Sequence, residues 1–209
     1  MILNRIDENG IFFFENNQRA FLKNLWLQDR AVDYLVSNIT PASELTLSYK
    51  NLKNDRYGNL AADIYFNGTW LQKELLEKGL AIFYDTSGDD EASLLLNFEK
   101  TARENRQGFW EDLSKIQKAE SINPYFNDKA LVIGKVDHIK TTKNNIFINF
   151  GKDFKKSFAV QTDTKIALPQ LEGQMVLVRG FIQKYHSAFI SLKSPFHIEI
   201  IDEKDWSLP

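Results

Sequence analysis

The segment from Asn54 to Asn59 combines residue types that could bind a phosphate group or a partner. It holds a carboxylate, Asp55, followed by a guanidinium, Arg56, an aromatic ring and a glycine. A guanidinium can donate two parallel hydrogen bonds to a phosphate, which makes Arg56 a candidate binding residue. The same pattern also suits a polar turn, in which Asp55 binds backbone N–H groups and Gly58 takes a positive φ. We favour the turn for Asp55 and Gly58 and leave the role of Arg56 open.

A second candidate group consists of carboxylates near the N-terminus, which could hold a divalent cation weakly. Asp29 and Asp33 are one helical turn apart and can share a helix face, and Asp7 and Glu8 precede them in the chain. The simpler interpretation, which we favour, is that Asp29 caps a helix and offsets its dipole. We therefore expect no metal ion and no cofactor, and keep Asp29 and Asp33 as weak metal candidates. The three histidines are far apart in sequence, which argues against a zinc site.

A third candidate group lies in the last third of the chain, where lysines and aromatic residues are interleaved near expected turns. Basic grooves with aromatic rings bind single-stranded nucleic acid through stacking and charge. The competing interpretation, which we favour, is that the aromatic residues belong to a core and the lysines are solvated. The candidate binding residues of this group are Lys140, Lys143, Lys152, Lys155, Lys156, Lys184 and Tyr185.

The composition of the 209-residue chain suits one large domain or two small ones. Hydrophobic residues make up 43% of the chain, enough for a core, and the lack of cysteine excludes disulfides and thiolate zinc sites. No apolar run approaches the roughly 20 residues that span a membrane, and the first residues lack the apolar stretch of a signal peptide. We therefore expect a soluble protein, and its compartment stays open.

The net charge of −2 conceals an uneven distribution along the chain. Residues 121–209 contain 12 lysines and arginines against 9 aspartates and glutamates, whereas residues 1–120 contain 14 against 19. A polyanion would be steered away from the acidic first part.

Hydrophobic periodicity predicts a mixed first part and an all-β second part. Apolar residues at helical spacing predict helices over residues 29–39, 71–80 and 92–107. Strands are predicted between them at residues 11–14, 20–27, 45–49, 61–66 and 81–84, and later at residues 130–139, 146–150, 158–162, 175–184, 188–192 and 196–201. We predict a first domain at residues 1–112, a polar linker at 113–127 and a small β-barrel at 128–209.

Several residues of the first part occur in the order and spacing of a known family. They are Asp55-Arg56-Tyr57-Gly58, Ala62, Gly68, Leu75-Leu76, Gly79-Leu80-Ala81, Tyr84, Glu99, Ala102-Arg103, Gly108 and Trp110. With them, residues 45–110 resemble the second half of a thermonuclease (staphylococcal nuclease-like) domain. The resemblance implies a β-barrel-dominated α+β fold, in which three helices surround a five-stranded barrel of the oligonucleotide/oligosaccharide-binding (OB) kind.

The second part resembles a small OB-like barrel that some bacterial thermonuclease-like proteins carry at their C-terminus. The similarity covers residues 131–201. It rests on Gly134-Lys135-Val136, the run from Ile146 to Gly151, Phe158, Leu171-Glu172-Gly173, Val178-Arg179-Gly180 and Pro195. These residue types are typical of turns and core positions and do not indicate a reactive site.

The chain departs from the family at the positions that carry the chemistry. The resemblance implies two arginines on the phosphate, two aspartates on Ca²⁺ and a glutamate as general base. The matching positions here are Phe21 and Asn59 for the arginines, a residue near Gly10 and Trp26 for the aspartates, and Asp29 for the glutamate. An amide carries no charge and lacks the fork that a phosphate needs. The resemblance therefore implies the scaffold of a nuclease without its catalytic residues.

Three functions are compatible with these patterns. The favoured one is a catalytically inactive thermonuclease-like protein that acts as a binding or scaffolding module. A protein partner is favoured, because Phe21 and Trp26 replace charges and suggest an apolar contact surface. The second is a divergent Ca²⁺-dependent nuclease that hydrolyses phosphodiester bonds with other carboxylates. The third is a binder of single-stranded nucleic acid through the C-terminal barrel. Family members are often exported, but no export signal is evident here.

Overall fold

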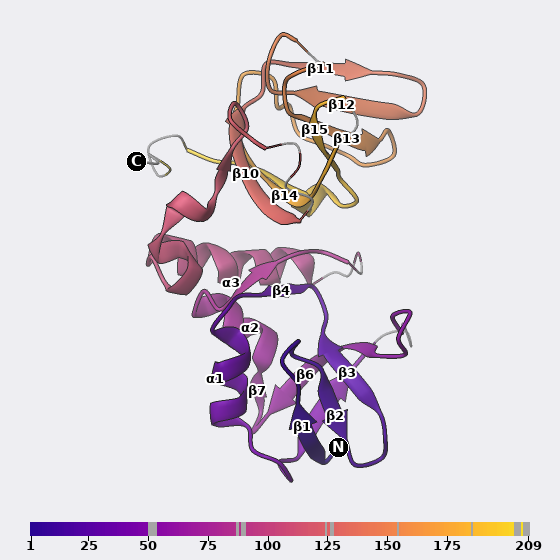
Figure 1. The fold of residues 1–209 in the computed structure, drawn as a ribbon, viewed down its shortest axis with the longest axis vertical. Helices are drawn as coiled ribbons and strands as arrows, with labels where there is room; N and C mark the ends of the chain where they lie inside the picture. Colours follow the sequence, from indigo (N-terminus) through magenta and orange to yellow (C-terminus); the bar gives the residue numbers. More distant parts are fainter. Residues whose placement is uncertain are drawn as a thin grey trace. The chain divides into compact units, whose positions relative to one another are not determined.

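The chain forms two compact units, Met1–Glu111 and Asp112–Pro209, each with its own strands (Figure 1). The computed structural model describes residues 1–49, 54–86, 88, 91–123, 125, 128–153, 155–184, 186–202 and 206. No helix among these residues is both long and apolar enough to cross a membrane.

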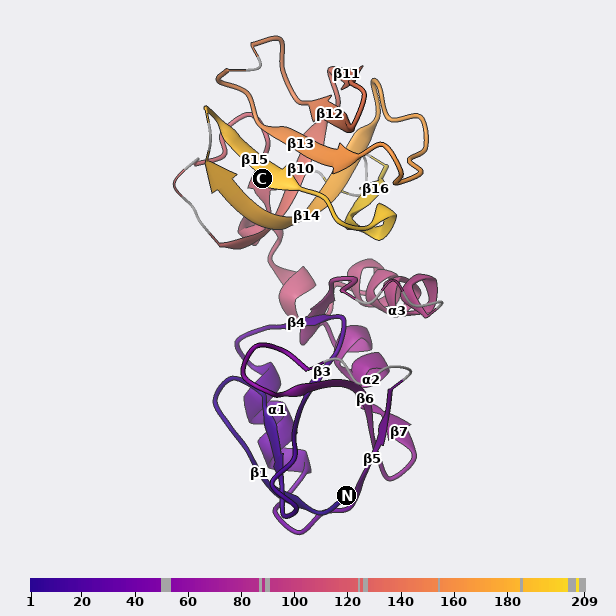
Figure 2. The same ribbon diagram turned by 90° about the vertical axis from the view of Figure 1, so that its right-hand side faces the viewer.

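The first unit is built on a sheet that curls into a barrel (Figure 2). Its strands follow the order β1-β2-β3-β6-β5, in which β3 and β6 run parallel and the other neighbours antiparallel. A bridge between Ile2 and Glu44 joins the two ends of this sheet, so β1 lies beside β5. The strands are β1 (Leu3–Ile6), β2 (Phe12–Phe14), β3 (Arg19–Leu22), β5 (Leu45–Ser48), β6 (Leu60–Phe66) and the short β7 (Thr69–Trp70), which pairs with β6.

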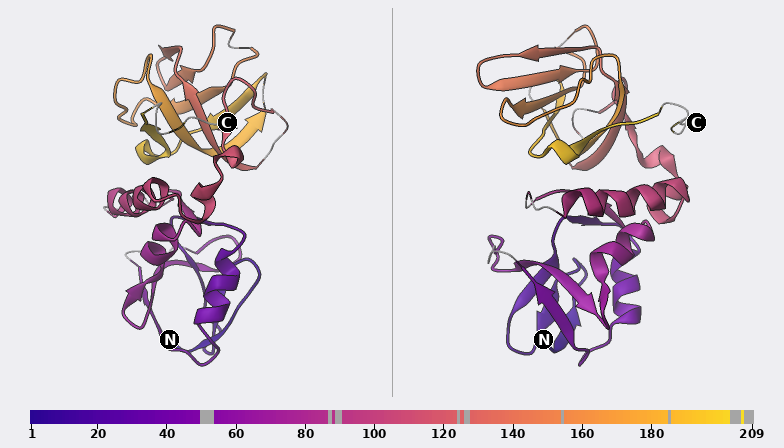
Figure 3. Two further views of the ribbon diagram at one scale, coloured as in Figure 1. Left: turned by 90° about the vertical axis from the view of Figure 1, so that its left-hand side faces the viewer. Right: turned by 180° about the vertical axis from the view of Figure 1, so that it is seen from behind.

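The described part of the first unit contains three α-helices beside this barrel, as the sequence predicted (Figure 3). They are α1 (Ala31–Asn38), α2 (Leu71–Glu77) and α3 (Ala92–Glu104), followed by the 3₁₀ turn η1 (Gly108–Glu111). Helix α2 contacts both β6 and α3, and its buried residues Leu75 and Leu76 extend the core outward from the barrel. A separate pair of strands, β4 (Leu25–Leu27) and β8 (Ala81–Phe83), lies next to these helices in the chain.

Two glycines of the family pattern allow a close backbone contact near α2. Gly79 and Gly108 have φ angles of +62° and +56°. A Cβ atom on Gly79 would lie 2.0 Å from the carbonyl oxygen of Gln107, and one on Gly108 would lie 2.5 Å from that of Lys78. Side chains at either position would therefore force the two segments apart. Close packing therefore explains these two glycines of the family pattern.

The second unit is a second closed sheet. Its strands follow the order β11-β12-β13-β15-β14-β10-β9, and β13 and β15 run parallel. Because Val136 and Asp137 alone separate β10 from β11, the two sides of the sheet are joined covalently and the sheet closes. The strands are β9 (Gln117–Lys118), β10 (Lys129–Lys135), β11 (His138–Thr141), β12 (Asn145–Asn149), β13 (Ala159–Asp163), β14 (Met175–Lys184), β15 (Ala188–Ser191) and β16 (Ile198–Ile200).

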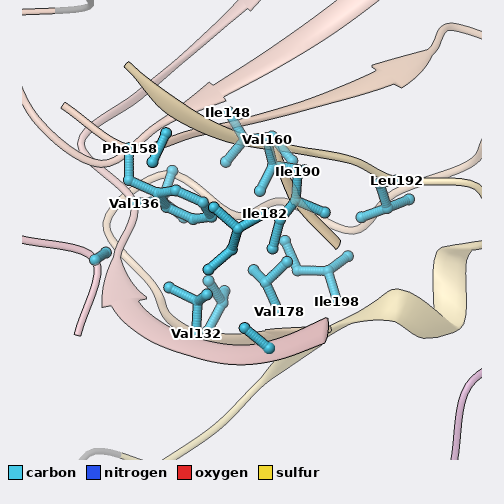
Figure 4. Packing of buried hydrophobic residues seen from close by; sticks show 14 of the residues in the cluster. Val132, Val136, Ile148, Phe158, Val160, Val178, Ile182, Ile190, Leu192 and Ile198 are labelled. Carbon is cyan, nitrogen blue, oxygen red and sulfur yellow. The ribbon is translucent and has the colours of Figure 1, made fainter. Parts of the chain in front are cut away.

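The core of the second unit is mainly aliphatic, with Phe158 among its members (Figure 4), and it contains one row of side chains that follows the strand pairing. Strand pairing places these residues opposite one another on five neighbouring strands: Ile139, Ile148, Val160, Ile190 and Ile182. Ile139 packs against the cluster and the other four are buried in it. Residues one position away on each strand must then face outward, because strand side chains alternate between faces.

The stretch predicted as a linker is partly integrated into the second unit. Leu113–Lys115 form the 3₁₀ turn η2, and Gln117–Lys118 pair with β10 as β9. Ala119 belongs to the core of this unit. Leu113, Ile116 and Ala119 are buried, whereas Ser114, Lys115 and Glu120 between and after them are exposed.

Candidate functional site

The turn from Asp55 to Asn59 is organised by the Asp55 carboxylate. Its Oδ1 accepts hydrogen bonds from the backbone N–H groups of Tyr57 (2.8 Å) and Asn59 (2.9 Å). Burial favours the neutral carboxyl, but these bonds, a further one from the Asn59 side chain and the charge of Arg19 lower the pKa of Asp55 below its usual value. Gly58, at φ +81°, supplies the bend. The turn expected for Asp55 and Gly58 is what the structure shows.

Asn59 occupies the position of the expected catalytic arginine and is held inside this turn. Its Nδ2 donates to Oδ2 of Asp55 at 2.9 Å, and the residue is 6% exposed. Its Oδ1 is buried and has no hydrogen-bond partner among the described residues. The Asn59 side chain is thus turned onto a neighbouring carboxylate and does not project a donor into solvent.

Cations do lie near this turn, but they come from other positions. A guanidinium nitrogen of Arg19 donates to the carbonyl oxygen of Tyr57 at 2.5 Å. Arg56 is exposed, and its guanidinium lies 4.7 Å from the centre of the Tyr57 ring, which is 61% exposed. Phe21, two residues after Arg19 on β3, is half-buried beside Ala61 of β6. An exposed tyrosine with two arginines therefore belongs to the turn that carries Asn59.

Trp26 does not provide the expected open apolar surface. Its ring is 6% exposed and stacks on Tyr84, with 4.2 Å between ring centres and an angle of 21° between their planes. Strand β4 pairs Trp26 with Ile82 of β8, which fixes this arrangement. Trp26 is a packing residue here, and of the proposed pair only Phe21 keeps accessible surface.

The acidic candidates are exposed but do not form the predicted cap. The N-cap of α1 is Arg30, without a side-chain cap bond, and Asp29 lies one residue earlier. Asp33 lies in the first turn, where a carboxylate suits the helix dipole. The prediction that Asp29 caps this helix is therefore wrong by one position.

The residues at the family's Ca²⁺ positions do not fit that ion. Trp26 offers no oxygen ligand. The Asp7 carboxylate accepts backbone N–H groups of Asn9 (3.0 Å) and Ile11 (2.9 Å), and so shapes a turn. No group of three or more His, Asp and Glu side chains that could hold a metal occurs in the part of the chain that the structure describes.

A buried ion cluster in the first unit was not predicted from the sequence. Nζ of Lys23 lies 2.8 Å from Oδ2 of Asp63 and 3.2 Å from Oε2 of Glu91, and the Lys23 side chain is 6% exposed. The indole nitrogen of Trp70 donates to Oδ1 of Asp63 at 3.3 Å. Burial raises the pKa of Asp63, and the Lys23 ammonium opposes this shift without offsetting it. The three charges lie on segments that are distant in sequence.

The lysine candidates of the second unit are all exposed at strand ends and turns. Lys140 is on β11 and Lys184 ends β14, where its Nζ lies 3.7 Å from the centre of the Tyr125 ring. Lys156 pairs with Asp153 at 3.7 Å. Tyr185 lies outside the described residues. The remaining candidates, Lys143, Lys152 and Lys155, occupy the two turns that flank β12.

Comparison with known proteins supports the resemblance of the first unit. Residues 15–112 match the family described as staphylococcal nuclease homologue. The chain is 43% identical over 56 residues to staphylococcal-like nuclease CAN1 of Arabidopsis thaliana, which is 27% of this chain and 17% of that protein. It is 41% identical over 58 residues to an uncharacterized 38.1 kDa protein of Capnoides sempervirens, 28% of this chain and 17% of the other.

The similarity is confined to part of each protein. The chain spans about a sixth of the curated relatives it matches, and a probable staphylococcal-like nuclease CAN1 of Oryza sativa subsp. japonica gives 39% identity over 56 residues, 27% of this chain and 16% of that one. The match to the family model is consistent with the fold of the described residues, which is a closed barrel with β3 parallel to β6 and three helices. Residues 15–112 therefore form a thermonuclease-like domain of the staphylococcal nuclease homologue family.

Proposed function

We propose that the first unit is a non-catalytic thermonuclease-like module that binds a protein partner. The observation that carries this proposal is the state of Asn59. The residue is neutral and buried, and Asp55 holds its amide group. A phosphate cannot receive a charge-assisted, bidentate contact from such a side chain.

The other positions reinforce the proposal. Phe21 is apolar where a second cation is expected, and Trp26 is packed on Tyr84 where a metal ligand is expected. Loss of one preorganised donor typically lowers the rate about 100- to 1,000-fold. Several losses in one site need not be additive, but together they leave little transition-state stabilisation.

The exposed turn offers a contact for a partner. Tyr57 is 61% exposed, with Arg56 against its ring and Arg19 on its carbonyl oxygen. Tyrosine and arginine are enriched at the energetically dominant positions of protein interfaces. This turn replaces the apolar pair Phe21 and Trp26 as the proposed contact, because Trp26 is buried.

A cleavage assay tests the proposal. The protein is incubated with a labelled single-stranded oligonucleotide and Ca²⁺, with EDTA in a parallel sample, and the products are separated on a denaturing gel. We expect an intact strand. Cleavage that EDTA stops and that Asp29→Ala removes, while the neighbouring exposed change Asp33→Ala does not, would replace the proposal with a divergent Ca²⁺-dependent nuclease.

A further inference from the structure

Cations and aromatic rings lie side by side on the outer surface of the first unit. Strand pairing places Arg5 of β1 opposite Phe13 of β2, and Phe13 opposite Arg19 of β3. The residues on either side of Phe13, which are Phe12 and Phe14, are buried in the core. Because strand side chains alternate between faces, Phe13 and the two arginines beside it lie on the outside of the barrel.

The same row continues onto the turn that carries Asn59. A guanidinium nitrogen of Arg19 donates to the carbonyl oxygen of Tyr57 at 2.5 Å, and the Arg56 guanidinium lies 4.7 Å from the centre of the Tyr57 ring. At the other end of the row, the Arg5 guanidinium lies 3.8 Å from the centre of the Phe13 ring. Guanidinium groups and rings therefore form one connected surface. We call it the arginine strip, and it consists of Arg5, Phe13, Arg19, Tyr57 and Arg56.

The positive charge of the arginine strip is not neutralised within the part of the chain that the structure describes. There, none of its three arginines forms an ion pair with a carboxylate. Asp55 precedes Arg56 in the chain, but its oxygens accept hydrogen bonds from the backbone N–H groups of Tyr57 and Asn59 and from the Asn59 side chain. The charge of Arg19 lowers the pKa of Asp55 without an ion pair between them. The strip is therefore open to carboxylates of another molecule.

The contacts inside the strip favour carboxylates over nucleic-acid bases. A guanidinium occupies one face of the Phe13 ring and one face of the Tyr57 ring. A base would have to displace that guanidinium before it could stack on the same ring face. A carboxylate, by contrast, accepts two parallel hydrogen bonds from the edge of a guanidinium that stays on its ring.

The surroundings of the strip favour a short anionic segment over a long polyanion. Glu15 directly follows β2, Glu44 pairs with Ile2 beside β1, and both glutamates are exposed. Residues 1–120 contain 14 lysines and arginines against 19 aspartates and glutamates. Nucleic acid carries a charge on every nucleotide, so a strand longer than the strip would meet this negative charge. A protein segment can carry carboxylates only where the arginines are.

We propose that the arginine strip binds an acidic segment of a partner protein, whose carboxylates pair with the guanidinium edges of Arg5, Arg19 and Arg56. The inference rests on the proposed function of the first unit as a protein-binding module, and it defines the chemistry of the partner. Tyrosine and arginine are enriched at the dominant positions of protein interfaces. Because these pairs are exposed, each should change the affinity only about two- to fivefold, and binding depends on all three together.

Fluorescence anisotropy with a labelled hexaglutamate peptide tests the proposal, with the whole chain at low salt, where exposed charges are screened least. We expect Arg5→Gln and Arg56→Gln each to weaken binding about two- to fivefold, and the double change to weaken it about tenfold. Arg56→Lys keeps the charge but loses the planar fork, so it should also weaken binding. Arg30→Gln is the matched control, because Arg30 is exposed at the start of α1, outside the strip, and it should leave the affinity unchanged.

A labelled single-stranded oligothymidylate with the same number of charges as the peptide is the comparison ligand, with EDTA present to prevent cleavage. We expect it to bind less tightly than hexaglutamate. Tighter binding of the oligothymidylate that the arginine changes weaken would overturn the proposal and make the strip a nucleic-acid surface.

Three further results would overturn the proposal. One is the lack of any anisotropy change with hexaglutamate. Another is peptide binding that Arg5→Gln and Arg56→Gln leave unaffected, because the lysines of the second unit would then explain it. The third is wild-type affinity in Arg56→Lys, which would leave charge alone as the cause. Circular dichroism of each variant separates these results from misfolding. The cleavage assay described above is independent of them, so failure of peptide binding with an intact oligonucleotide would remove this inference and leave the proposed loss of catalysis in place.

Discussion

Replacing Lys23 with methionine should destabilise the first unit by about 3–5 kcal/mol. The lysine lies 2.8 Å from Asp63, and both side chains are 6% exposed. Its removal would leave the Asp63 carboxylate buried with the indole N–H of Trp70 as a remaining partner. Breaking a buried pair on one side typically costs about 3–5 kcal/mol, since the remaining charge is uncompensated.

The matched control is Lys73→Met. Lys73 forms an i,i+4 pair with Glu77 at 3.8 Å, and its side chain is 47% exposed. Solvent screens such a pair, so its loss should cost less than about 1 kcal/mol. Urea unfolding at neutral pH measures both variants. A Lys23→Met protein within about 1 kcal/mol of the wild type would refute the view that this cluster is desolvated.

The pH dependence of the free energy of unfolding tests the same cluster in a second way. Burial raises the pKa of Asp63 above its unfolded value, so the folded state holds the proton more tightly. Stability from this group is therefore greatest at low pH and falls as pH rises from about 4 through the folded pKa. Without Lys23 that pKa should rise further. The destabilisation by Lys23→Met should then be smaller near pH 4 than at pH 7.

Two further predictions concern packing and ionisation. Gly79→Ala should destabilise by about 3 kcal/mol or more, because it adds a Cβ 2.0 Å from the Gln107 carbonyl to a left-handed backbone. The control is Gly68→Ala, because Gly68 has φ +79° and nothing lies within 4 Å of the added Cβ. Its loss of stability should be only the cost of the left-handed backbone, about 1–2 kcal/mol. Thermal unfolding measures both variants, and equal losses of stability would contradict the prediction. Burial and the hydrogen bond to Glu74 raise the pKa of Tyr34 to about 12. The stability that the neutral Tyr34 contributes is therefore intact below pH 10 and is lost as the pH rises toward 12. Tyr34→Phe should also remove one late step from the titration of tyrosinate absorbance. An unchanged absorbance titration would contradict this prediction.

Most elements of the fold were predictable because their patterns are local. Residues 175–184 were predicted as a strand and form β14 with the same bounds. The last strand begins later than predicted, because Ser194 caps a 3₁₀ turn that Pro195 starts. The predicted start of α1 missed its cap, since Arg30 takes the N-cap position without any side-chain bond and leaves no sequence signal.

The candidate site was predictable only in part. The turn at Asp55 follows from short-range hydrogen bonds, so its residue types indicate it. By contrast, the burial of Trp26 depends on Tyr84, which is distant in sequence. Similarly, Lys23 meets Asp63 and Glu91 only after the chain has closed on itself, and neither pairing has a periodic signature.

The closure of both sheets bears on how copies of this chain meet one another. An open sheet exposes a row of unpaired N–H and C=O groups that can template a strand from another copy. In the first unit the Ile2–Glu44 bridge brings the two sheet ends together, and in the second the covalent step from β10 to β11 does so. Among the described residues, the strands that pair outside these two rings are β4, β7, β8, β9 and β16, and each is only 2 or 3 residues long. Such short edges offer few hydrogen bonds, so the folded chain is expected to resist strand-templated aggregation even when it is concentrated on a partner.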